Sequence, residues 1–179
     1  LAGLAWLAAA LALLAAIAVL DDRFTLTSRA PFERSAEVLL DRARAFERQL
    51  ALETPAADYA HGFGYSREYL AWLEQTRSGP DRFAPLAVAQ PPALYYWYRS
   101  SPRLLVALNG RGGVGFADPP VTITGMVNMV LGSDGTLYEF HLVPAHVESL
   151  AGAAPAPIDW PTFFAAAGLD FSRFAPATP

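Results

Sequence analysis

The first twenty residues, Leu1–Leu20, read LAGLAWLAAALALLAAIAVL and contain neither a charged residue nor a proline. At a helical rise of about 1.5 Å per residue, this stretch reaches about 30 Å, the thickness of the hydrocarbon core of a bilayer. The sequence therefore predicts a single membrane-spanning helix. A cleaved signal peptide and a buried core helix are the alternatives, although the apolar run exceeds the roughly 7–15 residues of a signal-peptide core.

The rest of the 179-residue chain is long enough for one ordinary domain. A formal net charge of −4 argues against a nucleic-acid partner. The absence of cysteine excludes disulfides, thiolate metal sites and thiol nucleophiles. We expect a single-pass protein of the inner (cytoplasmic) membrane whose domain is extracytoplasmic, although the acidic residues after the span do little to set orientation.

Changes in composition divide the chain into segments. A polar tether is expected over residues 21–31, and one α+β domain over 32–150. An alanine- and proline-rich linker follows over 151–157. We expect a C-terminal helix packing on the domain over 158–174 and a short tail over 175–179.

A long amphipathic helix is predicted to begin after Ser35, whose hydroxyl is expected to cap it. Apolar residues recur at spacings of three and four, which is typical of a helix with one buried face: Ala36, Leu39, Leu40, Ala43, Phe46 and Leu50. The opposite face is charged and expected to be solvated: Glu37, Asp41, Arg42, Arg44, Glu47 and Arg48. A second, short helix is predicted after Ser66, with its apolar side formed by Tyr69, Leu70 and Leu73.

Alternation of large and small residues predicts a strand over residues 59–65, with an aromatic face and a bare face. Leu94–Tyr98 predicts a further strand, and we expect Leu104–Leu108 to return beside it as a hairpin. Val121–Leu131 and Leu137–Val143, joined by the Asp-Gly turn around Gly135, predict a second hairpin. The expected fold is α+β: the long helix packed on an antiparallel sheet of four or five strands arranged as hairpins, with two additional short helices.

Aromatic residues of two strands are the candidate binding residues. Because side chains alternate along a strand, Tyr96 and Tyr98 point to one face of the sheet, and Tyr95 and Trp97 point to the other. One face is expected to be core under the long helix, and the other to meet the second helix or to remain exposed as a binding face. The candidate ligand-binding set is Tyr59, His61, Phe63, Tyr95 and Trp97.

No catalytic, metal or cofactor site is predicted. Gly110–Gly115 fits the pattern G-x-G-x-x-G, but a strand follows it instead of the helix N-terminus that a phosphate needs. His61 and His141 could meet across the sheet, with Asp58 or Glu139 beside them, but their spacing is not diagnostic of a metal site. The chain lacks a Gly-x-Ser-x-Gly elbow and a distinct pair of carboxylates.

Several groups of residues carry a family resemblance: Pro31-Phe32, Ser35–Leu39, Ala43-Arg44, His61–Phe63, Tyr65, Trp97–Pro102, Pro119-Pro120 and Gly125–Val127. They resemble the region that follows the membrane span in bacterial receptor-type serine/threonine protein kinases. The resemblance implies a cytoplasmic kinase domain upstream of Leu1 and an extracytoplasmic region here. The kinase signatures H-R-D and D-F-G are absent, so no kinase catalytic residue is carried onto this chain. The outline is also similar to PepSY-like and cystatin-like units.

We therefore expect a non-catalytic, membrane-tethered sensor or interaction module. Its expected partners are the lipid bilayer through Leu1–Leu20, the upstream cytoplasmic domain, and an unidentified ligand or protein, with a homodimer left open. A membrane-anchored protein of envelope assembly without a kinase is the alternative. A hydrolase or metal-binding enzyme is less favoured, and a deep polar cleft around His61 and Glu139 would support it.

Overall fold

The computed structural model describes residues 2–24, 26–30, 32–52, 55–79, 81–88, 90–110, 112–144 and 158–177. It confirms the α+β fold, because these residues form five α-helices and one four-stranded antiparallel sheet. The chain divides into two compact units. The helical unit contains Leu1–Phe32 and Ser66–Leu94, and the sheet unit contains Glu33–Tyr65 and Tyr95–Pro179. The residues expected as one domain over 32–150 thus belong to both units, and the linker expected over 151–157 lies outside the described residues.

The helical unit contains α1 (Ala2–Phe24), α2 (Leu26–Arg29), α4 (Arg67–Thr76) and a 3₁₀ turn, Ala84–Ala87. Most of the expected tether is therefore helical. Helix α4 begins as predicted, with the Ser66 hydroxyl accepting a hydrogen bond from the backbone N–H of Tyr69 at 3.2 Å. A small core holds this unit together: Ala30, Leu73, Leu86 and Ala93, with Tyr69, Leu70 and Phe83 packed against it.

From Leu4 to Ile17, helix α1 presents only apolar side chains to its surroundings. Every residue from Leu4 to Ile17 is apolar and exposed. The long side chains among them are more than half exposed: Leu4, Trp6, Leu7, Leu11, Leu13, Leu14 and Ile17. Across the part of the chain that the structure describes, no helix combines the length and the apolarity that crossing a membrane requires.

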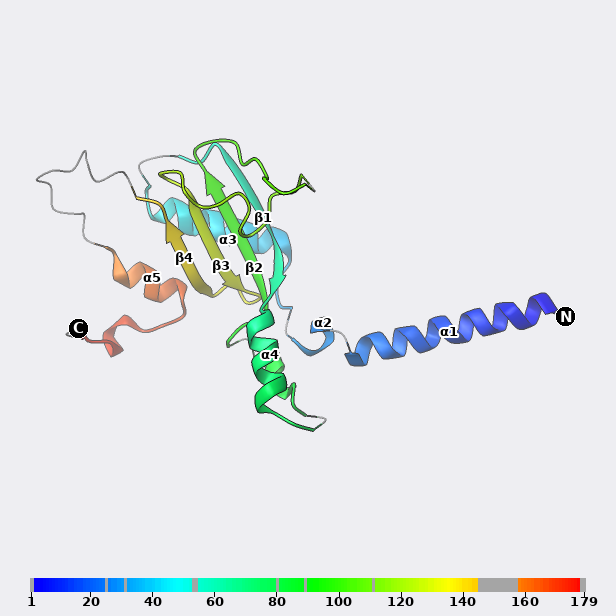
Figure 1. The fold of residues 1–179 in the computed structure, drawn as a ribbon. Helices are drawn as coiled ribbons and strands as arrows, with labels where there is room; N and C mark the ends of the chain where they lie inside the picture. The colour runs from blue at the N-terminus through cyan, green and yellow to red at the C-terminus, as the bar shows by residue number, and fades with distance from the viewer. Residues whose placement is uncertain are drawn as a thin grey trace, which may run out of the picture. The chain divides into compact units, whose positions relative to one another are not determined.

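The sheet unit contains β1 (Asp58–Tyr65), β2 (Leu94–Ser101), β3 (Val127–Gly132) and β4 (Leu137–Leu142). The four strands lie side by side in chain order, so that β1 and β4 are the two edges (Figure 1). Strands β2 and β3 are antiparallel, as are β3 and β4. Helix α3 (Ala36–Gln49) crosses one face of the sheet, which we call the inner face (Figure 1).

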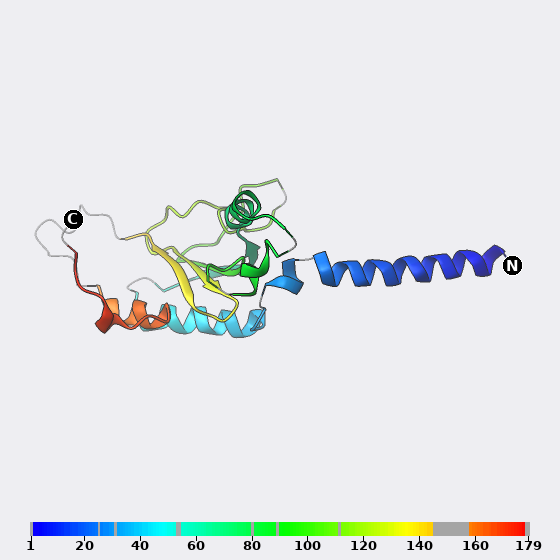
Figure 2. The ribbon, with the colours of Figure 1, turned by 90° about the horizontal axis from the view of Figure 1, so that it is seen from below.

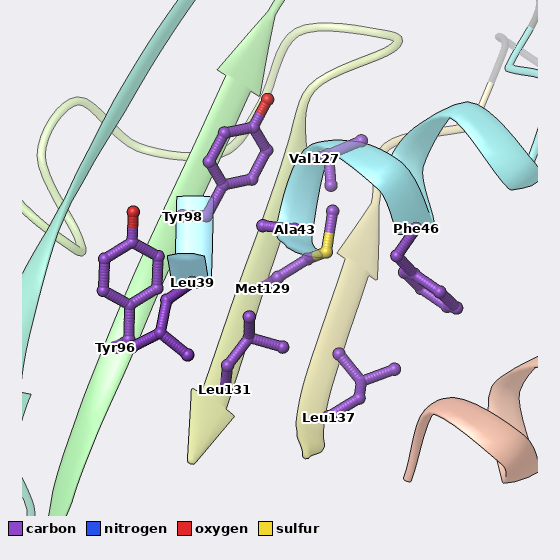
Figure 3. Packing of buried hydrophobic residues seen from close by; sticks show 9 residues of the cluster. All are labelled: Leu39, Ala43, Phe46, Tyr96, Tyr98, Val127, Met129, Leu131 and Leu137. Atoms are coloured by element: carbon purple, nitrogen blue, oxygen red, sulfur yellow. The ribbon is translucent and has the colours of Figure 1, made fainter. Parts of the chain in front are cut away.

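The predicted apolar stripe of α3 forms the main core. Leu39, Ala43 and Phe46 are buried against the inner face (Figure 3). The sheet contributes Tyr96, Tyr98, Val127, Met129, Leu131 and Leu137. A further helix, α5 (Trp160–Ala166), places the ring of Phe163 5.5 Å from that of Phe46 and 5.2 Å from that of Phe140. Edge-on contacts between these rings extend the core beyond the sheet.

The expected hairpin between Leu94–Tyr98 and Leu104–Leu108 is wrong. Strand β2 forms, but residues 104–108 are not a strand, and Leu104 and Leu108 are largely exposed. The reason is that both edges of β2 are already occupied, by β1 on one side and β3 on the other. A strand pairs along only two edges, so residues 104–108 cannot pair with β2.

The turn of the second predicted hairpin is correct, but the first strand of the hairpin is shorter than predicted. Strand β3 begins at Val127, so the expected extended stretch over Val121–Thr124 is irregular. Gly125, at φ +82°, interrupts the pattern just before the strand. In the turn, Gly135 has φ +84° and Asp134 accepts hydrogen bonds from the backbone N–H and hydroxyl of Thr136. Asp-Gly chemistry therefore sets the register of β3 and β4, as expected.

The charged face of α3 is not purely solvated. Glu47 accepts a hydrogen bond from the Tyr98 hydroxyl at 2.7 Å and another from the Ser100 hydroxyl. Burial raises the pKa of Tyr98, and its hydroxyl stays protonated as a donor. Ser35 precedes α3 as expected, but its hydroxyl makes no cap bond and instead hydrogen-bonds to the side chain of Glu37.

Candidate functional site

Three of the five predicted binding residues gather at one edge of the sheet. Tyr59, His61 and Phe63 alternate along β1 on the inner face, each next to a tyrosine of β2. The His61 and Phe63 rings lie 5.6 Å and 5.3 Å from the ring of Tyr96. Tyr59 and Phe63 remain 43% and 39% exposed, although Tyr96 beneath them is fully buried. We call Tyr59, His61, Phe63 and Tyr96 the aromatic edge.

Two charged residues of α3 border the aromatic edge. The Arg44 guanidinium lies 3.9 Å from the centre of the Tyr59 ring, within the range of a cation–π interaction. Glu37 lies in the first turn of α3 and interacts electrostatically with His61. Hydrogen bonds from its own backbone N–H and from Ser35 lower the pKa of Glu37, so it is ionised at neutral pH. The aromatic edge is thus flanked by one positive and one negative group.

The buried base of the aromatic edge carries an unused hydrogen-bonding group. Within the described residues, the hydroxyl of Tyr96 is buried and has no hydrogen-bond partner. Burial raises the pKa of Tyr96, which keeps this hydroxyl protonated. A buried polar group without a partner costs about 1–3 kcal/mol, and natural proteins seldom retain one without a reason.

The other two predicted binding residues, Tyr95 and Trp97, lie on the opposite, outer face of the sheet. They cover the bare side of β1: a Cβ added at Gly62 would lie 2.9 Å from the Trp97 indole, and one at Gly64 would lie 2.6 Å from the Tyr95 ring. The bare face of β1 therefore receives two aromatic rings from β2. The five predicted residues thus form two groups separated by the sheet.

The outer face is covered by the long segment between β2 and β3. Figure 2 shows this segment on the side of the sheet away from α3. The fully buried guanidinium of Arg99 donates hydrogen bonds to the carbonyls of Gly115, at 2.8 Å, and Pro119. Asp118 accepts the backbone N–H groups of Leu108 and Asn109 and lies near Arg99. These bonds, mainly that from Leu108, lower the pKa of Asp118.

A second candidate site is a cavity of about 350 Å³ on the outer face of β3 and β4. His141 Nε2 lies 2.8 Å from Glu139 Oε1, and Asn128 lies directly opposite His141 in the sheet register. The buried Oδ1 of Asn128 has no partner among the described residues. The cavity lining offers no hydroxyl or thiol nucleophile beside the imidazole.

The expected meeting of His61 and His141 across the sheet is wrong. His61 contacts Tyr96 on the inner face, whereas His141 points to the outer face, because its neighbour Phe140 belongs to the inner core. Glu139 is also on the outer face, so no polar cleft joins it to His61. Among the described residues, no three histidine, aspartate or glutamate side chains form a group that could hold a metal ion.

A larger cavity, about 610 Å³, lies between the end of α3, β4 and the start of α5. Its lining is mostly apolar, with Leu50, Phe140 and Trp160 among the larger side chains. The carboxylate of Asp159 already accepts the Thr162 hydroxyl at 2.6 Å. This cavity is therefore large enough for a small molecule, but its lining does not present a converging set of polar groups that would orient one.

Comparison with known proteins adds no assignment. No family model, curated protein or solved structure matches this chain. The case for function therefore comes from the sequence and the geometry of the chain itself. Sequence inspection found the aromatic residues of β1 but missed Arg44, Glu37 and Tyr96 as their neighbours. The available signal was the helical spacing of Glu37 and Arg44, seven residues apart and hence on one side of α3.

Proposed function

We propose that this chain is a non-catalytic, membrane-tethered interaction module that binds through its aromatic edge. The observation that carries the proposal is the surface of α1, where every residue from Leu4 to Ile17 is both apolar and exposed. Water is a poor solvent for such a helix, because large exposed apolar surfaces mark contact with lipid or with another protein. The proposal places α1 in lipid as the anchor, within the stretch Leu1–Leu20.

The aromatic edge supports the binding role. It combines exposed rings at Tyr59 and Phe63, the imidazole of His61 and the flanking charges of Arg44 and Glu37. Aromatic residues and arginine are enriched where proteins bind one another. Among the described residues, the groups beside these rings do not include a nucleophile paired with a base, so the site favours recognition over chemistry.

The finer part of the proposal follows from the resemblance to receptor-type kinases. In this arrangement the module faces the extracytoplasmic side and is coupled through α1 to a cytoplasmic serine/threonine kinase domain. The complete reading frame tests this part directly. A kinase domain encoded upstream supports it. An initiator methionine within a few residues of Leu1 would instead support an envelope protein without a kinase.

Alkaline carbonate extraction tests the tether. Membranes from cells expressing the chain are washed at high pH, and we expect the protein to remain in the pellet. The Leu11→Arg variant places a charge in α1 and should shift the protein toward the supernatant, since a central arginine costs about 2.5–3.5 kcal/mol on insertion scales. Leu108→Arg, a similarly exposed leucine of the sheet unit, is the matched control and should change nothing. Release of the unsubstituted, uncleaved chain would refute the tether.

A further inference from the structure

Strand β1 is an unusually open edge of the sheet. Its side chains alternate regularly between exposed and half-buried over all eight residues, Asp58–Tyr65. The strand has no proline, lysine or arginine, which are among the usual devices that prevent an edge from pairing with another chain. The opposite edge, β4, has such protection: a register shift opposite Val130/Leu131, and the Glu139 carboxylate in contact with His141.

The sequence of this edge is almost the same in both directions. From Tyr59 to Tyr65 it reads Tyr-Ala-His-Gly-Phe-Gly-Tyr, which is nearly symmetric about Gly62. If two copies pair antiparallel around Gly62, Tyr59 faces Tyr65 of the second copy, His61 faces Phe63, and Ala60 faces Gly64. Every ring then meets a ring on the inner face, and every small residue meets a small residue on the outer face.

We propose that the partner of the aromatic edge is a second copy of this chain, joined β1 to β1 in this register. A two-fold symmetric dimer requires a surface that is complementary to itself, and the near-palindrome supplies it. Facing aromatic residues stabilise antiparallel strand pairs. The inference rests on the proposed function in one respect: anchoring in a membrane raises the effective concentration of one copy for another.

Charge is compatible with this arrangement. Apart from Asp58, the titratable side chains of β1 are the phenols of Tyr59 and Tyr65, which are neutral near pH 7, and the imidazole of His61. From α3, the groups near these side chains are Arg44, over Tyr59, and Glu37, near His61. Asp58 is occupied within its own chain, where it accepts the backbone N–H groups of Tyr59 and Leu105. The proposed pairing of β1 with β1 therefore places no two groups of like charge opposite each other.

Disulfide trapping tests the register. Because the chain has no native cysteine, only the introduced cysteines can form a disulfide. Two differently tagged copies of the full chain, one with His61→Cys and one with Phe63→Cys, are co-expressed, and the isolated membranes are oxidised. Facing residues have Cβ atoms about 4.5–5.5 Å apart, close to disulfide geometry. We expect a mixed-tag disulfide dimer at least about five-fold more abundant than with the pair Tyr59→Cys and His61→Cys, which this register places four residues apart along the strands.

Equal trapping in both mixtures, or none in either, would overturn the proposal. A second measurement guards against variants that misfold: two differently tagged unsubstituted copies must co-purify from mild detergent. If they do not, the dimer is refuted whatever the cysteine variants do. The trapping and carbonate experiments together distinguish a failure of the dimer proposal from a failure of the tether proposal. A chain that resists carbonate but is not trapped refutes the dimer alone, and a chain that is trapped but released by carbonate refutes the tether alone.

Discussion

Replacing Gly62 with alanine should destabilise the sheet unit, which is the opposite of what its place in a strand suggests. Glycine in the middle of a strand normally costs about 0.5–1 kcal/mol relative to alanine, because the unfolded chain is more flexible. On that reasoning alone Gly62→Ala would stabilise the protein. The structure predicts otherwise, since the added Cβ would lie 2.9–3.1 Å from three atoms of the Trp97 indole.

The size of the effect depends on whether Trp97 can move. Its side chain is 9% exposed, and the ring atoms in question are the indole body, not a flexible end. Forcing one extra carbon into a packed region costs about 1–3 kcal/mol. After the entropic gain of alanine is subtracted, we expect a net loss of about 1–2 kcal/mol in the free energy of unfolding. The urea midpoint should then fall by roughly 0.5–1 M.

The assay is urea denaturation of the full chain in detergent, followed by far-ultraviolet circular dichroism. Gly113→Ala is the matched control, because no atom lies within 4 Å of its added Cβ, and it should be neutral or slightly stabilising. In a Trp97→Phe background the smaller ring leaves space, so the penalty of Gly62→Ala should disappear. If Gly62→Ala raised the midpoint as Gly113→Ala does, the close packing of β1 against Trp97 would be wrong.

Three further predictions concern polar groups. Glu47→Ala leaves the buried hydroxyls of Tyr98 and Ser100 without their acceptor, so it should cost about 2–4 kcal/mol in a urea titration, whereas Asp41→Ala on the exposed face of α3 should cost almost nothing. Arg99→Met removes the donors to Gly115 and Pro119, and amide exchange across residues 105–121 should accelerate at least about ten-fold, with exposed Arg103→Met as control. The pKa of Asp118 is lowered in the folded chain, so its stabilising effect is present above its ordinary pKa and is lost as pH falls below about 4. The protection factors of the Leu108 and Asn109 amides, which compare the exchange rate with the intrinsic rate at each pH, should therefore fall on acidification. Asp118→Asn should abolish that pH dependence, and a profile unchanged by the substitution would contradict the prediction.

Local sequence patterns correctly predicted the elements whose residues are compatible with only one local structure. The spacing of Leu39, Ala43 and Phe46 fits only one face of a helix, and those residues are the ones buried. The Asp-Gly turn at Asp134-Gly135 requires a positive φ that glycine adopts easily, and it fixes the hairpin that follows. In both cases the deciding interactions lie within a few residues of one another.

The failures concern partners that are distant in sequence. Leu104–Leu108 has the composition of a strand, but β1 and β3 already hold both edges of β2, and no local signal reveals that competition. The candidate binding residues show the same limit. Alternation along β1 and β2 separated the two faces of each strand correctly, but it gave no means of knowing which face of β1 aligns with which face of β2. Tyr95 and Trp97 therefore lie on the outer face, away from Tyr59, His61 and Phe63.

Two violations of ordinary folding rules coincide at the aromatic edge, which is why we place function there. Tyr96 retains a buried hydroxyl without a partner among the described residues, and β1 retains an edge without proline, lysine or arginine to discourage pairing. Neither feature helps an isolated copy to fold. Phenylalanine at position 96 would remove the unpartnered hydroxyl, and a lysine in β1 would protect the edge, each at little cost to stability. Natural sequences tend to keep such conflicts where binding requires them. A partner that lies along β1 would cover the exposed rings and use the open edge at once, so a single interaction accounts for the exposure of the rings and for the open edge.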